Sequence, residues 1–144
     1  MMTTGLENYY RRDQKDGISP PDLSKESSFV EHIVHARGKR SSLTSVSLDP
    51  AKITEFGPQL YRLKVQELLG DKHELIEHQH LIAHLQNAAN SSTKADKAQA
   101  IQAHRYALRR KEALIKWMFN TATVERKDLI NWAYSHVQRY FSRS

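Results

Sequence analysis

The sequence has no cysteine among its 144 residues, which excludes a disulfide framework, a thiolate metal site and a cysteine nucleophile. It has no apolar run near 18 residues, so we expect no membrane-spanning helix and no membrane partner. Its five glycines are scattered, and none belongs to a glycine-rich motif that binds phosphate at the start of a helix. We therefore expect no cofactor.

The start of the chain also lacks a recognisable targeting segment. Its first 17 residues have no apolar signal core, and three acids (Glu7, Asp13 and Asp16) depart from the acid-poor pattern of a transit peptide. A leader removed earlier would leave the same start. Hydrophobic residues make up 39% of the chain and charged residues 26%, which indicates one small soluble domain with a modest core.

Acids are scarce in the last third of the chain. Residues 94–144 hold 11 Lys or Arg and four acids, whereas residues 1–93 hold 11 bases and 12 acids. The net charge of +6 therefore belongs to the last third. Such a concentration is typical of a protein that binds a polyanion, and a solvated basic helix face is the alternative.

The stretch from Gln99 to Met118 has the clearest pattern. Its apolar residues recur at spacings of three, four and seven, which predicts an amphipathic helix over residues 94–119. The apolar side, including Trp117, is expected to pack into the core. The polar side carries His104, Arg105, Arg109, Arg110, Lys111 and Lys116.

The other segments also favour helices. Residues 58–87 predict one long helix with a weak point at Gly70, or two stacked helices, and the polar residues 87–93 predict a loop. A short helix is expected after Asp49, a suitable N-cap before Pro50, one or two turns over residues 28–35, and a last helix from Thr123. We see no convincing strand, so the predicted fold class is all-α, a small antiparallel helical bundle.

We place the helical bundle in residues 47–144 and an extended N-terminal arm in residues 1–46. The arm includes a basic group around Gly38, formed by Arg37, Lys39 and Arg40. One interpretation is an arm that lies along an anionic surface. The other is a partly disordered tail.

Signals for catalysis or metal binding are weak. His73, Glu77, His80 and His84 share one face of the predicted helix, but Glu77 interrupts the H-E-x-x-H zinc motif and no third ligand set follows. No G-x-S-x-G nucleophile turn occurs. We therefore predict no metal site, no enzyme activity and no small-molecule substrate.

Several short motifs resemble, in order, those of the small-subunit ribosomal protein fifteen family. They are the pair His84-Leu85, then Asp96, the basic pair Arg109-Arg110 thirteen residues later, residues 114–118 (LIKWM), residues 124–126 (VER) and Leu129-Ile130. The resemblance spans roughly residues 58–139. Gln99 stands where the family has serine, the S-R-R start of its helix is lost, and the loop after His84 is about five residues longer.

The resemblance implies a helical bundle that binds a three-way junction of small-subunit ribosomal RNA beside neighbouring ribosomal proteins. It implies a mitochondrial ribosome in an extended form, with a cytoplasmic or chloroplast ribosome as the alternative. His84 and Asp96 would bond 2′-hydroxyls or base edges, and basic side chains would neutralise phosphates. The expected RNA-binding residues are His84, Lys94, Asp96, Lys97, Gln99, His104, Arg105, Arg109, Arg110, Lys111, Lys116 and Arg126.

Two other functions remain open from the sequence. One is a DNA-binding helical protein in which the last helix enters a groove. The other is a structural module that docks on a partner protein through exposed apolar residues such as Trp132, Tyr140 and Phe141. Salt dependence separates them, because binding to nucleic acid weakens steeply with salt.

Overall fold

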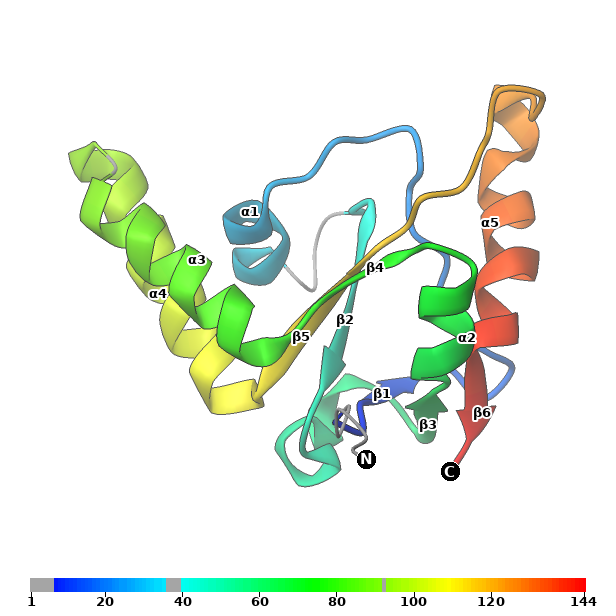
Figure 1. Ribbon diagram of the computed structural model, residues 1–144, viewed down its shortest axis with the longest axis horizontal. Helices are drawn as coiled ribbons and strands as arrows, with labels where there is room; N and C mark the ends of the chain where they lie inside the picture. Colours follow the sequence, from blue (N-terminus) through cyan, green and yellow to red (C-terminus); the bar gives the residue numbers. More distant parts are fainter. Residues whose placement is uncertain (1–6, 36–39, 92) are drawn as a thin grey trace.

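The computed structural model of the chain describes residues 7–35, 40–91 and 93–144. Its centre is a six-stranded antiparallel sheet with the strand order β4-β5-β2-β1-β3-β6, packed with helices (Figure 1). The predicted all-α bundle with an extended N-terminal arm is therefore wrong. Two strands come from the first 47 residues, and they lie inside the sheet.

The strands are β1 (Tyr10–Asp13), β2 (Leu43–Ser47), β3 (Gln59–Leu63), β4 (Glu74–Ile76), β5 (Glu112–Lys116) and β6 (Phe141–Arg143). The α-helices are α1 (Phe29–Val34), α2 (Val65–Gly70), α3 (His78–Ser91), α4 (Lys94–Arg110) and α5 (Leu129–Val137). Four short 3-10 turns complete the described elements: η1 (Pro50–Lys52), η2 (Thr54–Phe56), η3 (Arg126–Asp128) and η4 (Gln138–Tyr140).

The helix expected over residues 94–119 begins as predicted but ends at Arg110. Lys111 adopts the left-handed conformation (φ 52°), which ends a helix. The chain then enters β5, which pairs with β2 on one side and β4 on the other. Because both faces of β5 are covered, its middle residues, Ala113–Ile115, form a continuous apolar run. Periodicity alone does not separate such a run from a buried helix.

The helices cover the two faces of the sheet. On β5, Ile115 belongs to a core cluster that includes residues of α2 and α5, whereas Leu114 belongs to a second cluster with residues of α1, α3 and α4. This alternation follows from the two-residue period of a strand. In Figure 1 the α3–α4 hairpin extends from one end of the sheet, and α2 and α5 lie at the other.

The sheet divides into two halves, β4-β5-β2 and β1-β3-β6. The paired register between β1 and β2 is limited to Tyr10 with Ser47, whereas β1 pairs along its whole length with β3. Beyond that pair the two strands separate. The Arg11 Nη1 atom donates to the Ser45 carbonyl at 2.8 Å, so an arginine side chain satisfies a backbone acceptor that no β1 amide reaches there.

Some predicted elements are confirmed and others are not. Asp49 caps η1 through the Ala51 amide, and a short helix lies within residues 28–35 as expected. The long helix predicted over residues 58–87 is instead β3, α2, β4 and the start of α3, and α3 continues through most of the expected loop. The predicted division after residue 46 falls within β2. Arg37 and Lys39 of the predicted basic group lie outside the described residues.

A buried histidine links α2 to the end of β5. His73 Nδ1 accepts the Met118 amide hydrogen at 2.9 Å, and His73 Nε2 lies 3.2 Å from the Tyr140 hydroxyl. That hydroxyl donates to Asp71 at 2.7 Å, so Nε2 carries the hydrogen and donates to Tyr140. Burial lowers the pKa of His73, the charge of Arg139 adds to this, and Asp71 opposes it. His73 is therefore neutral at pH 7.

We expect the free energy of unfolding to fall between pH 7.5 and pH 5.5. The unfolded chain takes up a proton near the ordinary histidine pKa of 6.5, whereas the pKa of His73 in the folded chain is lower. The stability that His73 contributes is therefore complete above pH 6.5 and is lost as the pH falls toward the lower pKa. Urea unfolding at both pH values measures the loss. A His73→Asn variant keeps a side-chain acceptor and should show a smaller loss. An equal pH dependence in the variant would contradict this role of His73.

Candidate functional site

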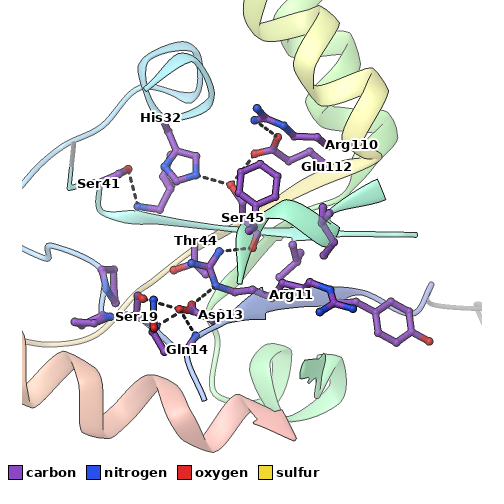
Figure 2. Close-up of a pocket in the computed structure, with 18 of the residues that line it drawn as sticks. Arg11, Asp13, Gln14, Ser19, His32, Ser41, Thr44, Ser45, Arg110 and Glu112 are labelled. Atoms are coloured by element: carbon purple, nitrogen blue, oxygen red, sulfur yellow. Dashed lines mark hydrogen bonds and ion pairs between the residues drawn. The ribbon is translucent and has the colours of Figure 1, made fainter. Parts of the chain in front are cut away.

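A polar pocket of about 560 Å³ opens where β1 and β2 separate (Figure 2). It is lined by both strands, by residues 19–21, by His32 of α1, by Phe56 of η2, by Arg110 at the end of α4 and by Glu112 at the start of β5. The volume falls in the range of small-molecule sites. The site is therefore a cavity between the two halves of the sheet, built from segments far apart in the sequence.

Glu112 is the central acid of this pocket, and its exposed fraction is 2%. Ser45 pairs with Leu114 across β2 and β5, which places Glu112 diagonally beside Ser45 on the same face of the sheet. Ser45 Oγ donates to Glu112 Oε2 at 2.6 Å. The other oxygen, Oε1, is buried and accepts no hydrogen bond from the residues that the structure describes. The nearest cation is the Arg110 Nη1 atom at 3.8 Å.

Burial raises the pKa of Glu112, and the hydrogen bond from Ser45 and the charges of Arg110 and Arg11 oppose that rise. A buried acid with a raised pKa and an unsatisfied oxygen costs stability. Such groups are concentrated at functional sites, because a ligand supplies the missing partner. Glu112 Oε1 is thus the best candidate in this pocket for a ligand-binding atom.

His32 extends the Ser45–Glu112 pair. Its Nε2 atom lies 2.6 Å from Ser45 Oγ, and since the serine hydrogen goes to Glu112, His32 donates through Nε2. His32 Nδ1 is buried and has no hydrogen-bond partner in the described part of the chain. Burial, followed by the charges of Arg11 and Arg110, lowers the pKa of His32 to about 4. The chain His32→Ser45→Glu112 therefore joins a neutral imidazole to the carboxyl group.

Asp13 is the second buried acid of the pocket, but its oxygens are fully occupied. Oδ2 accepts from Arg11 Nε at 2.7 Å and from the Ser19 amide at 2.9 Å. Oδ1 accepts from the Gln14 amide at 2.9 Å and from the Ser19 hydroxyl at 2.6 Å. Burial alone would raise the pKa of Asp13, but Arg11 and Ser19 together hold it below the ordinary value. Asp13 therefore stays ionised and orients Arg11.

Two arginines, Arg11 and Arg110, line the pocket. The Arg110 guanidinium lies 4.9 Å from the centre of the Phe56 ring and 4.7 Å from that of Tyr106, which holds its charge in place by cation–π contacts. Arg11 approaches from β1 and uses Nε and Nη1 for Asp13 and Ser45, as Figure 2 shows. Two fixed guanidinium groups therefore flank one buried carboxyl group.

Most of the predicted RNA-binding residues lie on the α3–α4 hairpin, defined here as residues 78–111. His84 is on α3, and Lys94, Asp96, Lys97, Gln99, His104, Arg105, Arg109 and Arg110 are on α4, directly before Lys111. Two others lie elsewhere: Lys116 ends β5, and Arg126 begins η3, on the far side of the molecule (Figure 1). The proposed docking residues Tyr140 and Phe141 are buried.

The sequence predictions missed the residues of the pocket. Arg11, His32, Ser45 and Glu112 belong to no linear motif that we recognised, and Glu112 was assigned to a helix. One signal was present: a lone acid directly before the apolar run Ala113–Ile115 is unusual at the start of a buried strand. In the described part of the chain, no cluster of acids and histidines could hold a metal ion, and no helix is long and apolar enough to cross a membrane.

Comparisons with family models, with curated proteins and with solved structures find no match to this chain. The predicted ribosomal function therefore stays a prediction, and the helical bundle that the resemblance implied is not the fold of this chain. The geometry of the pocket is the basis for a functional proposal.

Proposed function

We propose that the pocket binds NAD⁺ and cleaves the bond between its nicotinamide and ribose, passing ADP-ribose to an acceptor. The observation that carries this proposal is Glu112, a buried acid. One of its oxygens is held by Ser45, and the other has no hydrogen-bond partner among the described residues. A ribose hydroxyl would supply that partner. The sequence by itself predicts no enzyme activity, because the chain has no linear catalytic motif. The proposed function departs from that prediction.

The charges of the pocket favour a phosphate-containing ligand. Arg11 and Arg110 both line it, and guanidinium groups bind phosphate oxygens through paired hydrogen bonds. Arg11 Nη2 and the whole Arg110 guanidinium have no hydrogen bond within the described residues. They therefore have free donors for the two phosphates of a dinucleotide. Tyr10 also lines the pocket, and its ring can stack against a base.

The acids of the pocket restrict which glycosidic bond it can break. Enzymes that cleave ordinary glycosides use a pair of carboxyl groups, one of which protonates the leaving group. Here Asp13 is ionised and both of its oxygens already accept hydrogen bonds, and Glu55 is exposed to solvent. Among the described acids of the pocket, Glu112 therefore has no buried partner that could protonate a leaving group. This arrangement suits a leaving group that needs no proton. The nicotinamide of NAD⁺ is such a group, because it is a cation while bonded and neutral after release.

In the proposed reaction, the bond between ribose C1′ and the nicotinamide nitrogen breaks, and its electron pair leaves with nicotinamide. Positive charge develops on the ribose as in an oxocarbenium ion. Glu112 is buried and held by Ser45, and in its ionised form it stabilises that charge. The acceptor nucleophile then bonds to C1′ and releases its proton to Glu112 or to solvent.

The direct test is nicotinamide release from NAD⁺, followed by chromatography, with NADH as the matched control. NADH carries the same phosphates and riboses, but its dihydronicotinamide is uncharged and leaves poorly. We expect release from NAD⁺ and none from NADH. An absence of both NAD⁺ binding by calorimetry and nicotinamide release would contradict the proposal.

The pH dependence of the reaction should report on Glu112. The reaction needs the ionised carboxylate, whose pKa is raised by burial, so the rate should fall as the pH decreases through that raised pKa. The Ser45 hydrogen bond lowers this pKa. A Ser45→Ala variant should therefore move the acidic limb of the rate profile to higher pH, besides lowering the rate. A Ser47→Ala variant is the control, since Ser47 bonds backbone carbonyls instead. If the acidic limb of the rate profile stays at the same pH in the Ser45→Ala variant, the proposed role of the hydrogen bond between Ser45 and Glu112 is contradicted.

A further inference from the structure

Building on the proposed function, we infer that the acceptor of ADP-ribose is a nucleic acid bound along the basic α3–α4 hairpin. The hairpin (residues 78–111) carries six Lys or Arg and one acid, a net charge of +5, and the rest of the chain carries 16 bases and 15 acids. Nearly all the excess positive charge therefore belongs to one structural unit. Charge concentrated in this way is the electrostatic footprint of a polyanion partner.

Four exposed cations of the hairpin have no acidic partner within the described residues. Lys94, Lys97, Arg105 and Arg109 are exposed, and among the described residues none of the four forms an ion pair. The single acid, Asp96, accepts from the Thr93 hydroxyl at 3.0 Å. Arg105 and Arg109 are one turn apart, where like charges repel. A row of phosphates would relieve that repulsion.

The charged face of the hairpin leads to the pocket. Lys94, Arg105 and Arg109 lie along one side of α4, a length of about 22 Å at 1.5 Å per residue. The Arg109 guanidinium lies 5.1 Å from the centre of the Tyr106 ring, and Arg110, which lines the pocket, contacts the same ring. A strand bound along α4 would thus reach the opening beside Glu112.

The chemistry of the hairpin favours nucleic acid over an acidic protein. A nucleic acid strand has evenly spaced phosphates for the exposed cations, and their binding releases counterions. Tyr106 is half-buried, and its hydroxyl accepts a hydrogen bond from the Gln102 amide at 2.8 Å. An aromatic ring and an amide therefore lie beside the arginines, where they can stack on bases and form hydrogen bonds with them.

In the transfer reaction, a ring nitrogen or an exocyclic nitrogen of a base bonds to ribose C1′ as nicotinamide leaves. The proton of that nitrogen passes to Glu112 or to solvent.

The binding test uses fluorescence anisotropy with labelled 20-nucleotide RNA and DNA strands. If four phosphates are contacted, the affinity should fall about 50-fold between 50 and 200 mM salt. The Arg105→Glu/Arg109→Glu variant should bind at least about 30-fold more weakly. The matched control is Lys64→Glu/Lys127→Glu, an equal charge change at exposed positions outside the hairpin, which should change affinity less than about threefold. Equal losses in both variants would overturn the inference.

The transfer test uses NAD⁺ labelled in its adenylate, the same strands and, as an alternative acceptor, a mixture of acidic proteins. We expect label on RNA or DNA, lost in the hairpin variant, while nicotinamide release to water persists. If nicotinamide is released to water but no strand is labelled or bound, the inference is overturned and the proposed function stays intact. Label on protein alone has the same meaning. If a strand binds but no nicotinamide is released, both the proposed function and the acceptor role are overturned. Circular dichroism confirms that each variant is folded.

Discussion

Replacing Glu112 by Gln is expected to lower nicotinamide release from NAD⁺ about 10³-fold, with little change in NAD⁺ affinity. Gln has the same shape but no negative charge, so it loses the interaction with the ribose cation that forms only in the transition state. The phosphate contacts of Arg11 and Arg110 would remain. The effect should therefore appear in kcat and not in KM, and a steady-state assay of nicotinamide release measures both.

The same substitution should leave the fold intact. Burial raises the pKa of Glu112, which means that the folded state disfavours its charge. A neutral side chain of the same shape should therefore leave the free energy of unfolding, measured in urea, unchanged or larger. Glu125→Gln is the matched control, since Glu125 is exposed and its contact is an exposed ion pair with Lys127. A Glu112→Gln enzyme with activity near that of the control would remove Glu112 from the mechanism.

The second large effect is on stability. Leu114→Ala is expected to lower the free energy of unfolding by about 2–5 kcal/mol, because it removes a buried side chain and leaves a cavity. Leu114 is fully buried, with an exposed fraction of 0%. It lies on β5 and belongs to the core cluster that joins the sheet to α1, α3 and α4. Chemical denaturation at pH 7 measures the loss.

Leu108→Ala provides the control for that loss. The chemical change is the same, but Leu108 is on α4 with an exposed fraction of 44%, so we expect a change within about 0.5 kcal/mol. The pair also tests the structure against the predicted helix over residues 94–119, whose apolar side would bury both leucines. Equal losses would favour that continuous helix and contradict β5.

Several local features were predictable from the sequence. Asp49 and Pro50 marked the start of η1, residues 28–35 contained α1, and the polar residues before Lys94 marked the start of α4. These signals are local, since caps and turns depend on a few neighbouring residues. The concentration of positive charge after residue 93 is likewise a property of the sequence, and the structure places much of it on the hairpin.

The strands were not predictable in the same way. β5 is covered on both faces, so its apolar run has no alternation. β3 and β4 are short, with five and three residues, and their apolar residues also fit a helical period. Pairing with distant strands overrides local preference here. The resemblance to a helical ribosomal protein followed from the order of short motifs, which does not depend on whether the chain between them is helix or strand.

The sequence by itself determined a cysteine-free chain with a basic last third and several helix starts, because each of these depends on composition or on near neighbours. Only the tertiary structure decided the pocket. Arg11 and Ser45 are separated by 34 positions and Ser45 and Glu112 by 67, and strand register brings their side chains together. Register depends on which apolar faces pack across the whole sheet. A site assembled in this way exists only once the chain has folded.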